Sequence, residues 1–173
     1  MSSDSVIVER ISAEHDLTRF HCGRRELDDW LHRHAITSDR MDRTRVFVAH
    51  TGNEIVIGYF SLTMGSVLRD GPPAQLIRGL PRHPVGIALL ARLAIDEREQ
   101  GHGLGADLLH DALEYSVRAG ESVAARLVVV DALDDNAAKF YQRFGFIPSP
   151  NGDPLRLYRR VKDIRTSMGI SGS

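Results

Sequence analysis

The sequence has a single cysteine and no long apolar run, and these two shortages exclude several classes of protein. Cys22 is the only cysteine among 173 residues, so the chain cannot form an internal disulfide. No apolar stretch reaches the ~20 residues that cross a bilayer. The polar segment Met1–Arg10 lacks the basic and then apolar order of a signal peptide. These absences predict a cytoplasmic protein that has no membrane partner.

The sequence also lacks a strong excess of charge and a metal-binding pattern. Its formal net charge is −1, which argues against a dedicated nucleic-acid-binding protein. Basic residues gather at 40–45 and 156–165, and such clusters are either solvated surface or sites that attract phosphate groups. His32 and His34 do not share a face of the expected helix, and the other histidines have no ligand spacing, so we expect no metal ion.

Hydrophobic periodicity divides the chain into interleaved strands and helices. Strands are expected at 6–11, 45–50, 54–62, 85–96, 125–131, 146–147 and 155–161. Helices are expected at 22–42, 104–119 and 134–144, with one helical turn near 74–78 in the proline-rich connector 70–84. Gly52-Asn53 is a turn signal inside a hairpin, and Gly120 and Gly145 are expected to end helices. The interleaving predicts one α/β domain over residues 1–173, with its core at about 6–161 and a frayed tail at 167–173.

Gly101 and Gly103 lie between the expected strand that ends near Asp96 and the helix that begins at Leu104, and Gly105 follows in the first turn of that helix. The segment Gln100-Gly-His-Gly-Leu-Gly105 allows the backbone to turn tightly and to approach a ligand closely. The first amides of the helix have no partner within it, so together with the helix dipole they suit a pyrophosphate. A plain strand-to-helix turn remains the alternative. The Gly-Lys-Ser/Thr ending of a Walker loop is absent, and the loop comes too late in the chain for a dinucleotide-binding fold.

Around this loop the sequence resembles the GNAT superfamily of N-acetyltransferases. Leu93-Ala-Ile-Asp96 followed by the glycine loop is similar to motif A of that family, with Gln100, Gly103 and Gly105 in the signature positions. The resemblance implies a GNAT fold, which is a mixed, mostly antiparallel twisted sheet of six to seven strands flanked by about four helices. It also implies that acetyl-CoA is bound by loop amides at its pyrophosphate and by the strand at its pantetheine arm. The implied cofactor contacts are Leu93, Ala94, Ile95, Gln100, Gly101, His102, Gly103, Leu104, Gly105, Ala106, Asn136 and Phe140.

A second segment, Asn136-Ala-Ala-Lys-Phe-Tyr-Gln-Arg-Phe-Gly-Phe146, is similar to motif B of the same family. The resemblance gives Tyr141 the role of general acid that protonates the thiolate of departing CoA. Its chemistry fits, because a tyrosine is protonated at neutral pH and can donate. The spacing also fits a core aromatic for Tyr141 and Phe140. Asn136 either contacts CoA or caps the helix.

The resemblance is narrower still, to the GNAT toxins of bacterial toxin–antitoxin pairs, and it runs over about residues 6–161. It is carried by Phe20–Gly23 with Leu27 to Leu31, by Ile57–Leu62, and by Pro84–Ala94. Toxins of this branch acetylate the α-amino group of aminoacyl-tRNA. The resemblance therefore implies aminoacyl-tRNA as substrate, a ribbon-helix-helix antitoxin as partner, and a homodimer.

Arginines are the candidate contacts to tRNA phosphates. Arg92 is the one charge inside an apolar strand, so we expect it either to contact substrate phosphate or to form an internal ion pair. Arg78 and Arg82 in the connector are further candidates. The carboxylates of Asp96, Glu97 and Glu99 flank the loop, and solvated surface is the more common state of such groups than a general base.

Two other functions compete with the toxin hypothesis. One is a GNAT acetyltransferase that acts on a small-molecule amine or on a protein N-terminus. The other is a non-catalytic acyl-CoA-binding module that acts through a partner, and the presence of Tyr141 counts against it.

Overall fold

The computed structural model of the protein describes residues 5–170. These residues group into two compact units. The first unit runs up to Leu62 and includes Arg92–Asp111, and the second comprises Thr63–Ala91 with the residues from Ala112 onward. Three continuous elements, two strands and one helix, run through both units.

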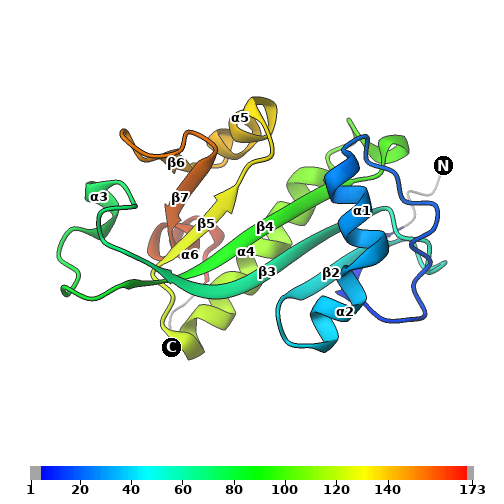
Figure 1. Ribbon diagram of the computed structural model, residues 1–173, viewed down its shortest axis with the longest axis horizontal. Helices are drawn as coiled ribbons and strands as arrows, with labels where there is room; N and C mark the ends of the chain where they lie inside the picture. Colours follow the sequence, from blue (N-terminus) through cyan, green and yellow to red (C-terminus); the bar gives the residue numbers. More distant parts are fainter. Residues whose placement is uncertain (1–4, 171–173) are drawn as a thin grey trace. The chain divides into compact units, whose positions relative to one another are not determined.

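The elements interleave as the periodicity predicts (Figure 1). The strands are β1 (Ile7–Arg10), β2 (Arg45–His50), β3 (Gly58–Val67), β4 (Val85–Ile95), β5 (Leu127–Asp131), β6 (Ile147–Pro148) and β7 (Arg156–Arg160). The helices are α1 (Arg25–Arg33), α2 (Ala35–Arg40), α3 (Ala74–Ile77), α4 (Leu104–Val123), α5 (Asp135–Arg143) and α6 (Val161–Met168), with a 3-10 turn, η1, at Glu97–Glu99. The strands form one seven-stranded sheet in the order β1-β2-β3-β4-β5-β7-β6. The expected mixed, mostly antiparallel sheet of six to seven strands is confirmed.

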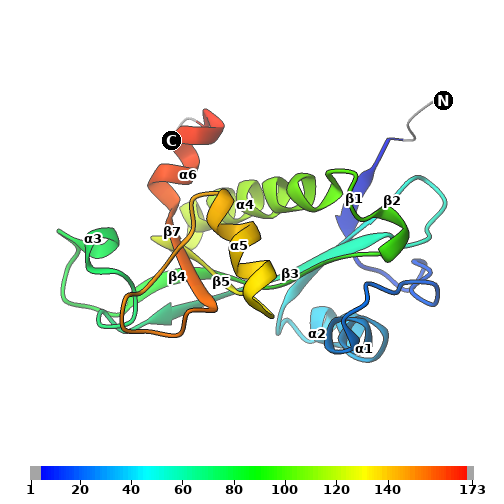
Figure 2. The ribbon, with the colours of Figure 1, turned by 90° about the horizontal axis from the view of Figure 1, so that it is seen from above.

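In the first unit, β1, β2 and β3 form an antiparallel meander. The side chains of β2 alternate, so that Val46 and Val48 are fully buried on one face. They pack in one cluster with Phe20, Leu31 and Tyr59. Figure 2 shows α1 and α2 together on one face of β2 and β3, with the first turns of α4 on the opposite face.

The single helix expected over 22–42 is wrong, because the chain breaks at His34 into α1 and α2. The break lets the two short helices meet the sheet separately. Leu31 of α1 is buried in the core, and the buried carboxylate of Asp39 in α2 accepts a hydrogen bond from the Val46 N–H at 2.9 Å. A continuous apolar stripe predicts one helix and does not indicate the hydrogen bond between Asp39 and Val46.

The hairpin between β2 and β3 is longer than the sequence suggests. β3 begins at Gly58 and not at 54, because residues 51–57 form a loop in which Glu54 has a φ of +63°. This loop is tied to the chain near Asp16, whose amide donates to the Glu54 carbonyl at 2.8 Å. Backbone bonds to a distant segment therefore replace the expected continuation of the strand.

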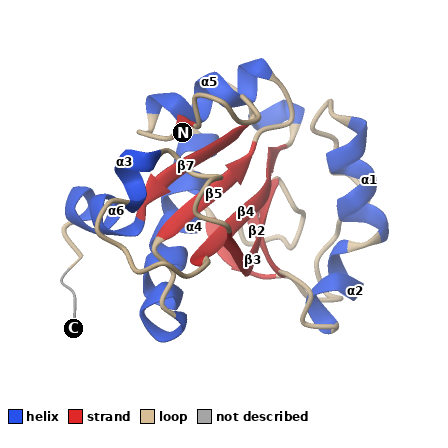
Figure 3. Ribbon diagram, turned by 60° about the vertical axis from the view of Figure 1, so that its left-hand side comes forward, coloured by secondary structure: helices blue, strands red, loops and turns tan. Residues whose placement is uncertain are grey.

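In the second unit, β4 and β5 pair in parallel, and β5 and β7 pair antiparallel (Figure 3). Residues 127–130 of β5 are fully buried, as expected of a strand that is covered on both faces. Tyr158 of β7 packs with Ile87 and Val129 in the core of this unit.

Two helix boundaries differ from expectation. Gly120 does not end α4, which continues to Val123. Instead, Gly120 allows the segment after the helix to pack closely against it, because a Cβ at position 120 would lie 3.3 Å from the Ala125 Cβ. The sequence also does not predict α6, which begins at Val161, where the last expected strand ends. This helix buries Val161 and Ile164, and its C-cap is Gly169, with a φ of +66°. The expected frayed tail is therefore helical up to Met168, and its residues 171–173 lie outside the described part. Among the described residues, no helix combines the length and the apolarity that a membrane crossing needs.

We predict that Asp39→Ala lowers the free energy of unfolding by about 3 kcal/mol. The substitution leaves the buried Val46 N–H without its acceptor and removes the ion pair with Arg10 at 2.7 Å. Glu114→Ala, which removes the exposed pair with Arg118 at 3.1 Å, should cost less than about 1 kcal/mol. Urea titrations of both variants and the wild type measure the difference. Equal effects would contradict a structural role for Asp39.

Candidate active site

The glycine loop forms a turn with unpaired amides at the start of α4. Gly101 and Gly103 have φ values of +82° and +84°, which side chains with a Cβ rarely adopt. A Cβ at either position would meet nothing within 4 Å, so backbone conformation and not crowding requires glycine here. The first helical bond joins the Asp107 N–H to the Gly103 carbonyl at 3.1 Å. The amides of residues 104–106 therefore have no partner within the helix and suit an anion.

The side chain of Gln100 braces this loop from the protein side. Its amide donates to the carbonyl oxygens of Ile95 at 2.8 Å and of Cys22 at 2.9 Å. Gln100 thus joins the end of β4 to the segment before α1. Its side-chain nitrogen is engaged with the protein, so it positions the loop.

Asp96, the residue after β4, fixes the turn that leads into the loop. Its buried carboxylate accepts bonds from the backbone and the guanidinium of Arg98 and from the His21 N–H at 3.1 Å. Although burial opposes its charge, these hydrogen bonds hold the pKa of Asp96 below the ordinary value. A carboxylate stabilised in this way is a poor general base, which leaves Asp96 as a structural residue.

Arg92 lies on an aromatic platform and not in an ion pair. Its guanidinium carbon is 3.8 Å from the centroid of the Trp30 ring, which stacks on Tyr59 with 6.0 Å between centroids. One guanidinium nitrogen is 3.4 Å from Ser61 Oγ. Among the described residues, the partners of the Arg92 guanidinium are Trp30, Ser61 and Tyr59, and none of them is a carboxylate, so the internal ion pair is not formed. Partial burial lowers the pKa of Arg92, but the group remains a cation.

The tyrosine motif forms α5, whose first turn is capped by the side chain of Asp134. This carboxylate accepts from the Ala137 N–H at 2.9 Å, so Asn136 is not the cap and is exposed. Tyr141 is buried and its ring packs edge-on against Phe140 and Phe146. Burial raises the pKa of Tyr141, so the phenol is protonated at neutral pH.

Comparison with known proteins decides the family. A family model described as "Acetyltransferase (GNAT) domain" matches residues 42–148. The chain belongs to the GNAT family of acetyltransferases.

The GNAT relatives share nearly the whole chain. A tRNA-acetylating toxin of Mycobacterium tuberculosis is 41% identical over 160 residues, which cover 92% of this chain and 95% of the relative. AtaT complexed with acetyl-methionyl-tRNAfMet is 28% identical with a TM-score of 0.86, over 95% of this chain and 99% of AtaT. A tyrosine-to-phenylalanine mutant of AtaT, bound to acetyl-CoA and the C-terminus of the antitoxin AtaR, is 27% identical with a TM-score of 0.81, over 96% and 99% of the two chains.

Membership of the GNAT family makes the chain an acetyl-CoA-dependent N-acetyltransferase. The structure places the expected loop contacts at 100–106 together on one turn in the first unit, beside the end of β4, and it places Tyr141 with Phe140 on α5 in the second unit. Arg78 and Arg82 are exposed beside α3. Trp30 under Arg92 was missed, since an aromatic at helical spacing predicts core and not a platform.

We predict that Gly103→Ala weakens acetyl-CoA binding about threefold to tenfold, because an alanine at a φ of +84° costs about 1 kcal/mol and relaxes the amide turn. Gly169→Ala is the matched control, since Gly169 also has a positive φ of +66° and open space around it. Isothermal titration with acetyl-CoA measures both variants. Unchanged affinity in Gly103→Ala would mean that the loop conformation does not limit binding.

Proposed function

We propose that this GNAT enzyme is a toxin that acetylates the α-amino group of aminoacyl-tRNA and so blocks translation. The observation that carries the proposal is the likeness, over more than nine-tenths of both chains, to a relative named for this activity. AtaT, which has a similar fold, has been solved with acetyl-methionyl-tRNAfMet, the kind of product that this reaction would give.

The residues present fit acetyl-CoA. The unpaired amides at the start of α4 and the helix dipole would bind the pyrophosphate, with Gln100 bracing the turn. The pairing of β4 with β5 runs from Ile87↔Leu127 to Leu90↔Val130, and β4 continues to Ile95. We assign the backbone of Leu93–Ile95 to the pantetheine arm, and Asn136 and Phe140 to further contacts. The two compact units would then act as one acetyltransferase domain.

Bound acetyl-CoA supplies a thioester whose sulfur leaves as a thiolate. We assign Tyr141 as the proton donor to that sulfur. Its raised pKa means that it holds the proton, and its hydroxyl makes no hydrogen bond to another described residue, which leaves it free to donate to a ligand. An α-amine with a pKa near 8 is partly neutral at pH 7, so the attack needs no strong base from the protein.

Arginines would hold the tRNA. We assign Arg92 to a substrate phosphate, because no carboxylate among the described residues neutralises it and Trp30 fixes its plane. Arg78 and Arg82 would contact the backbone of the nucleic acid, where contacts to phosphate position the substrate without reading sequence.

The toxin would work in the cytoplasm as a homodimer under the control of a ribbon-helix-helix antitoxin. The lone cysteine is compatible with a reducing compartment. AtaT bound to the C-terminus of AtaR supports an antitoxin partner.

We predict that Tyr141→Phe lowers turnover at least about a hundredfold while acetyl-CoA affinity stays within about twofold, because only the proton donor is lost. Tyr115→Phe, at an exposed tyrosine, is the control and should keep full turnover. Acetyl transfer to purified aminoacyl-tRNA and acetyl-CoA titration give the two readouts. Unchanged turnover in Tyr141→Phe would rule out the general-acid role.

The same variants test the function in bacteria. Induction of the wild type and of Tyr115→Phe should arrest growth and yield N-acetylated aminoacyl-tRNA, and Tyr141→Phe should do neither. Normal growth under wild-type induction, without acetylated tRNA, would overturn the toxin proposal and direct the search to small amines or protein N-termini.

We predict that Arg78→Ala with Arg82→Ala raises the KM for aminoacyl-tRNA about tenfold with little change in kcat. The slope of log(kcat/KM) against log salt should fall in magnitude by about 1.5, because two phosphate contacts are lost. The control is Arg25→Ala with Arg118→Ala, which removes the same charge at two exposed arginines that already face Asp29 and Glu114. Equal effects of the two pairs would show that net charge and not contact is responsible.

A further inference from the structure

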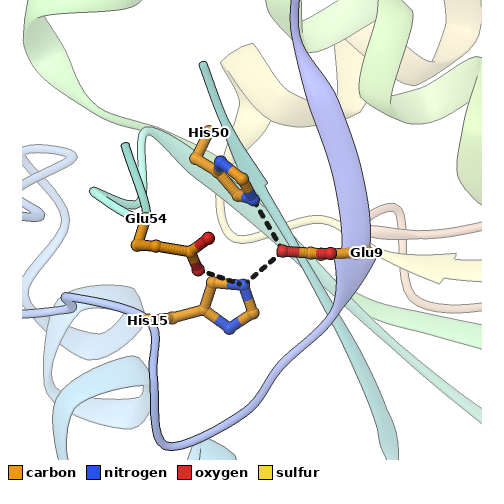
Figure 4. A group of neighbouring side chains, drawn as sticks. All are labelled: Glu9, His15, His50 and Glu54. Carbon is orange, nitrogen blue, oxygen red and sulfur yellow. Dashed lines mark hydrogen bonds and ion pairs between the residues drawn. The ribbon is translucent and has the colours of Figure 1, made fainter. Parts of the chain in front are cut away.

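Four metal-ligating side chains converge at the edge of the first unit, and none of them is assigned to acetyl transfer. This His–Glu cluster consists of Glu9, His15, His50 and Glu54 (Figure 4). One ligand atom from each side chain lies within 4.8 Å of all the others. No spacing along the chain indicates the cluster, because its residues come from β1, the end of β2 and two loops, and Glu9 and His50 are 41 positions apart.

The cluster has a buried side and an exposed side. The side chains of His15 and His50 are only 2% and 3% exposed, whereas those of Glu9 and Glu54 are 46% and 48% exposed. The nitrogens therefore sit beneath the surface, and the oxygens line the side from which an ion would enter. This arrangement offers two nitrogen and two oxygen ligands and a net charge of about −2 when the imidazoles are neutral.

The distances suit a small cation. Glu9 Oε1 is 2.8 Å from His15 Nε2 and 2.7 Å from His50 Nε2, and Glu54 Oε2 is 3.5 Å from His15 Nε2. For an ion about 2.05 Å from each ligand, the separation of Glu54 from His15 corresponds to an angle of about 120° and the two shorter ones to about 85°, so Glu9, whose side chain is half-exposed, must move outward from both imidazoles for tetrahedral geometry.

We propose that the His–Glu cluster binds one divalent transition-metal ion, for which zinc is the best match. Imidazole nitrogen with carboxylate oxygen suits zinc, whereas magnesium and calcium prefer oxygen ligands alone. The ion would join β1 and β2 to the loops 11–16 and 51–56, which already meet through the Asp16–Ile55 bridge. The site is structural, because it would tie two loops to the edge of the sheet.

The metal must change the tautomer of both imidazoles. His15 Nδ1 accepts the Ser12 N–H at 2.9 Å and His50 Nδ1 accepts the Gly52 N–H at 3.0 Å, so without metal the ring proton sits on Nε2 and faces Glu9. When Nε2 binds the ion, the proton moves to Nδ1 and the two amides lose their acceptor. Each Nδ1–H would then face a backbone N–H, donor against donor, so the Ser12 and Gly52 amides must turn away from the rings, and the binding free energy of a structural zinc site must offset that cost.

Titration of the full chain, purified without metal, with zinc tests the proposal. We expect one ion per chain, a rise in Tm of more than about 5 °C at a hundredfold excess over the Kd, and no competition from magnesium. Cys22 should not compete for zinc, because burial raises the pKa of its thiol to about 12. The absence of saturable one-to-one binding would overturn the proposal.

Two exposed glutamates give a matched pair of variants. Glu54→Gln removes a ligand charge but keeps the bonds between the imidazoles and Glu9, so it should fold normally and weaken zinc binding at least tenfold. Glu14→Gln changes an exposed carboxylate of the same region outside the cluster and should leave the Kd unchanged. Equal Kd values for the two variants would place zinc elsewhere.

NMR of the imidazole rings gives a second readout that does not depend on affinity. Without zinc, His15 and His50 should carry their protons on Nε2. With zinc, those protons should disappear, and the amide protons of Ser12 and Gly52 should exchange faster. Rings that keep Nε2 protons at saturating zinc would overturn the proposal and identify the cluster as a hydrogen-bonded network alone.

Discussion

The burial of β4 is the constraint on which the rest of the structure depends. This eleven-residue strand contains one charge, and it lies between β3 and β5 in the order of the sheet. Because its backbone must stay paired and its side chains covered, its end at Ile95 fixes where the chain leaves the sheet. The Asp96 carboxylate then accepts hydrogen bonds from four donors, which are the His21 N–H and three nitrogens of Arg98, and Gln100 ties the loop back to the Ile95 carbonyl. Hydrophobic burial of the strand therefore positions the functional loop.

The protein itself satisfies two polar side chains beside the glycine loop, those of Asp96 and Gln100. Arg98 neutralises Asp96, and the amide group of Gln100 is engaged with two carbonyl oxygens. The row of unpaired amides at the start of α4 remains for a ligand. A site built from backbone recognises the shape and charge of a pyrophosphate without depending on particular side chains. This explains why only the glycines and the brace of the motif carry a strong signal in the sequence.

Features that depend on local chemistry can be predicted from the sequence, whereas features that depend on distant partners cannot. Four elements could be predicted because each depends on periodicity and on glycine positions. They are the strands over 45–50 and 125–131, the glycine turn and the tyrosine helix. The break at His34 and the late start of β3 were not, since Asp39 pairs with Arg10, 29 positions away, and Glu54 is held by the backbone of Asp16. The platform of Trp30 and the His–Glu cluster were missed for the same reason. Neither has a spacing along the chain that differs from that of ordinary core residues or scattered polar residues.

Two charges near the end of β4 illustrate two solutions to the cost of burying an ion. The charge of Asp96 is neutralised by Arg98 and by backbone donors, so the carboxylate has little electrostatic effect on a ligand. Arg92 instead lies over the face of Trp30, and a ring quadrupole stabilises a cation without cancelling its charge. An ion pair would have made Arg92 inert toward phosphate, whereas stacking leaves its field intact and restricts its plane. A lysine would keep the charge but lose the flat stacking contact, so an arginine over an aromatic ring suits a cation in a partly buried strand.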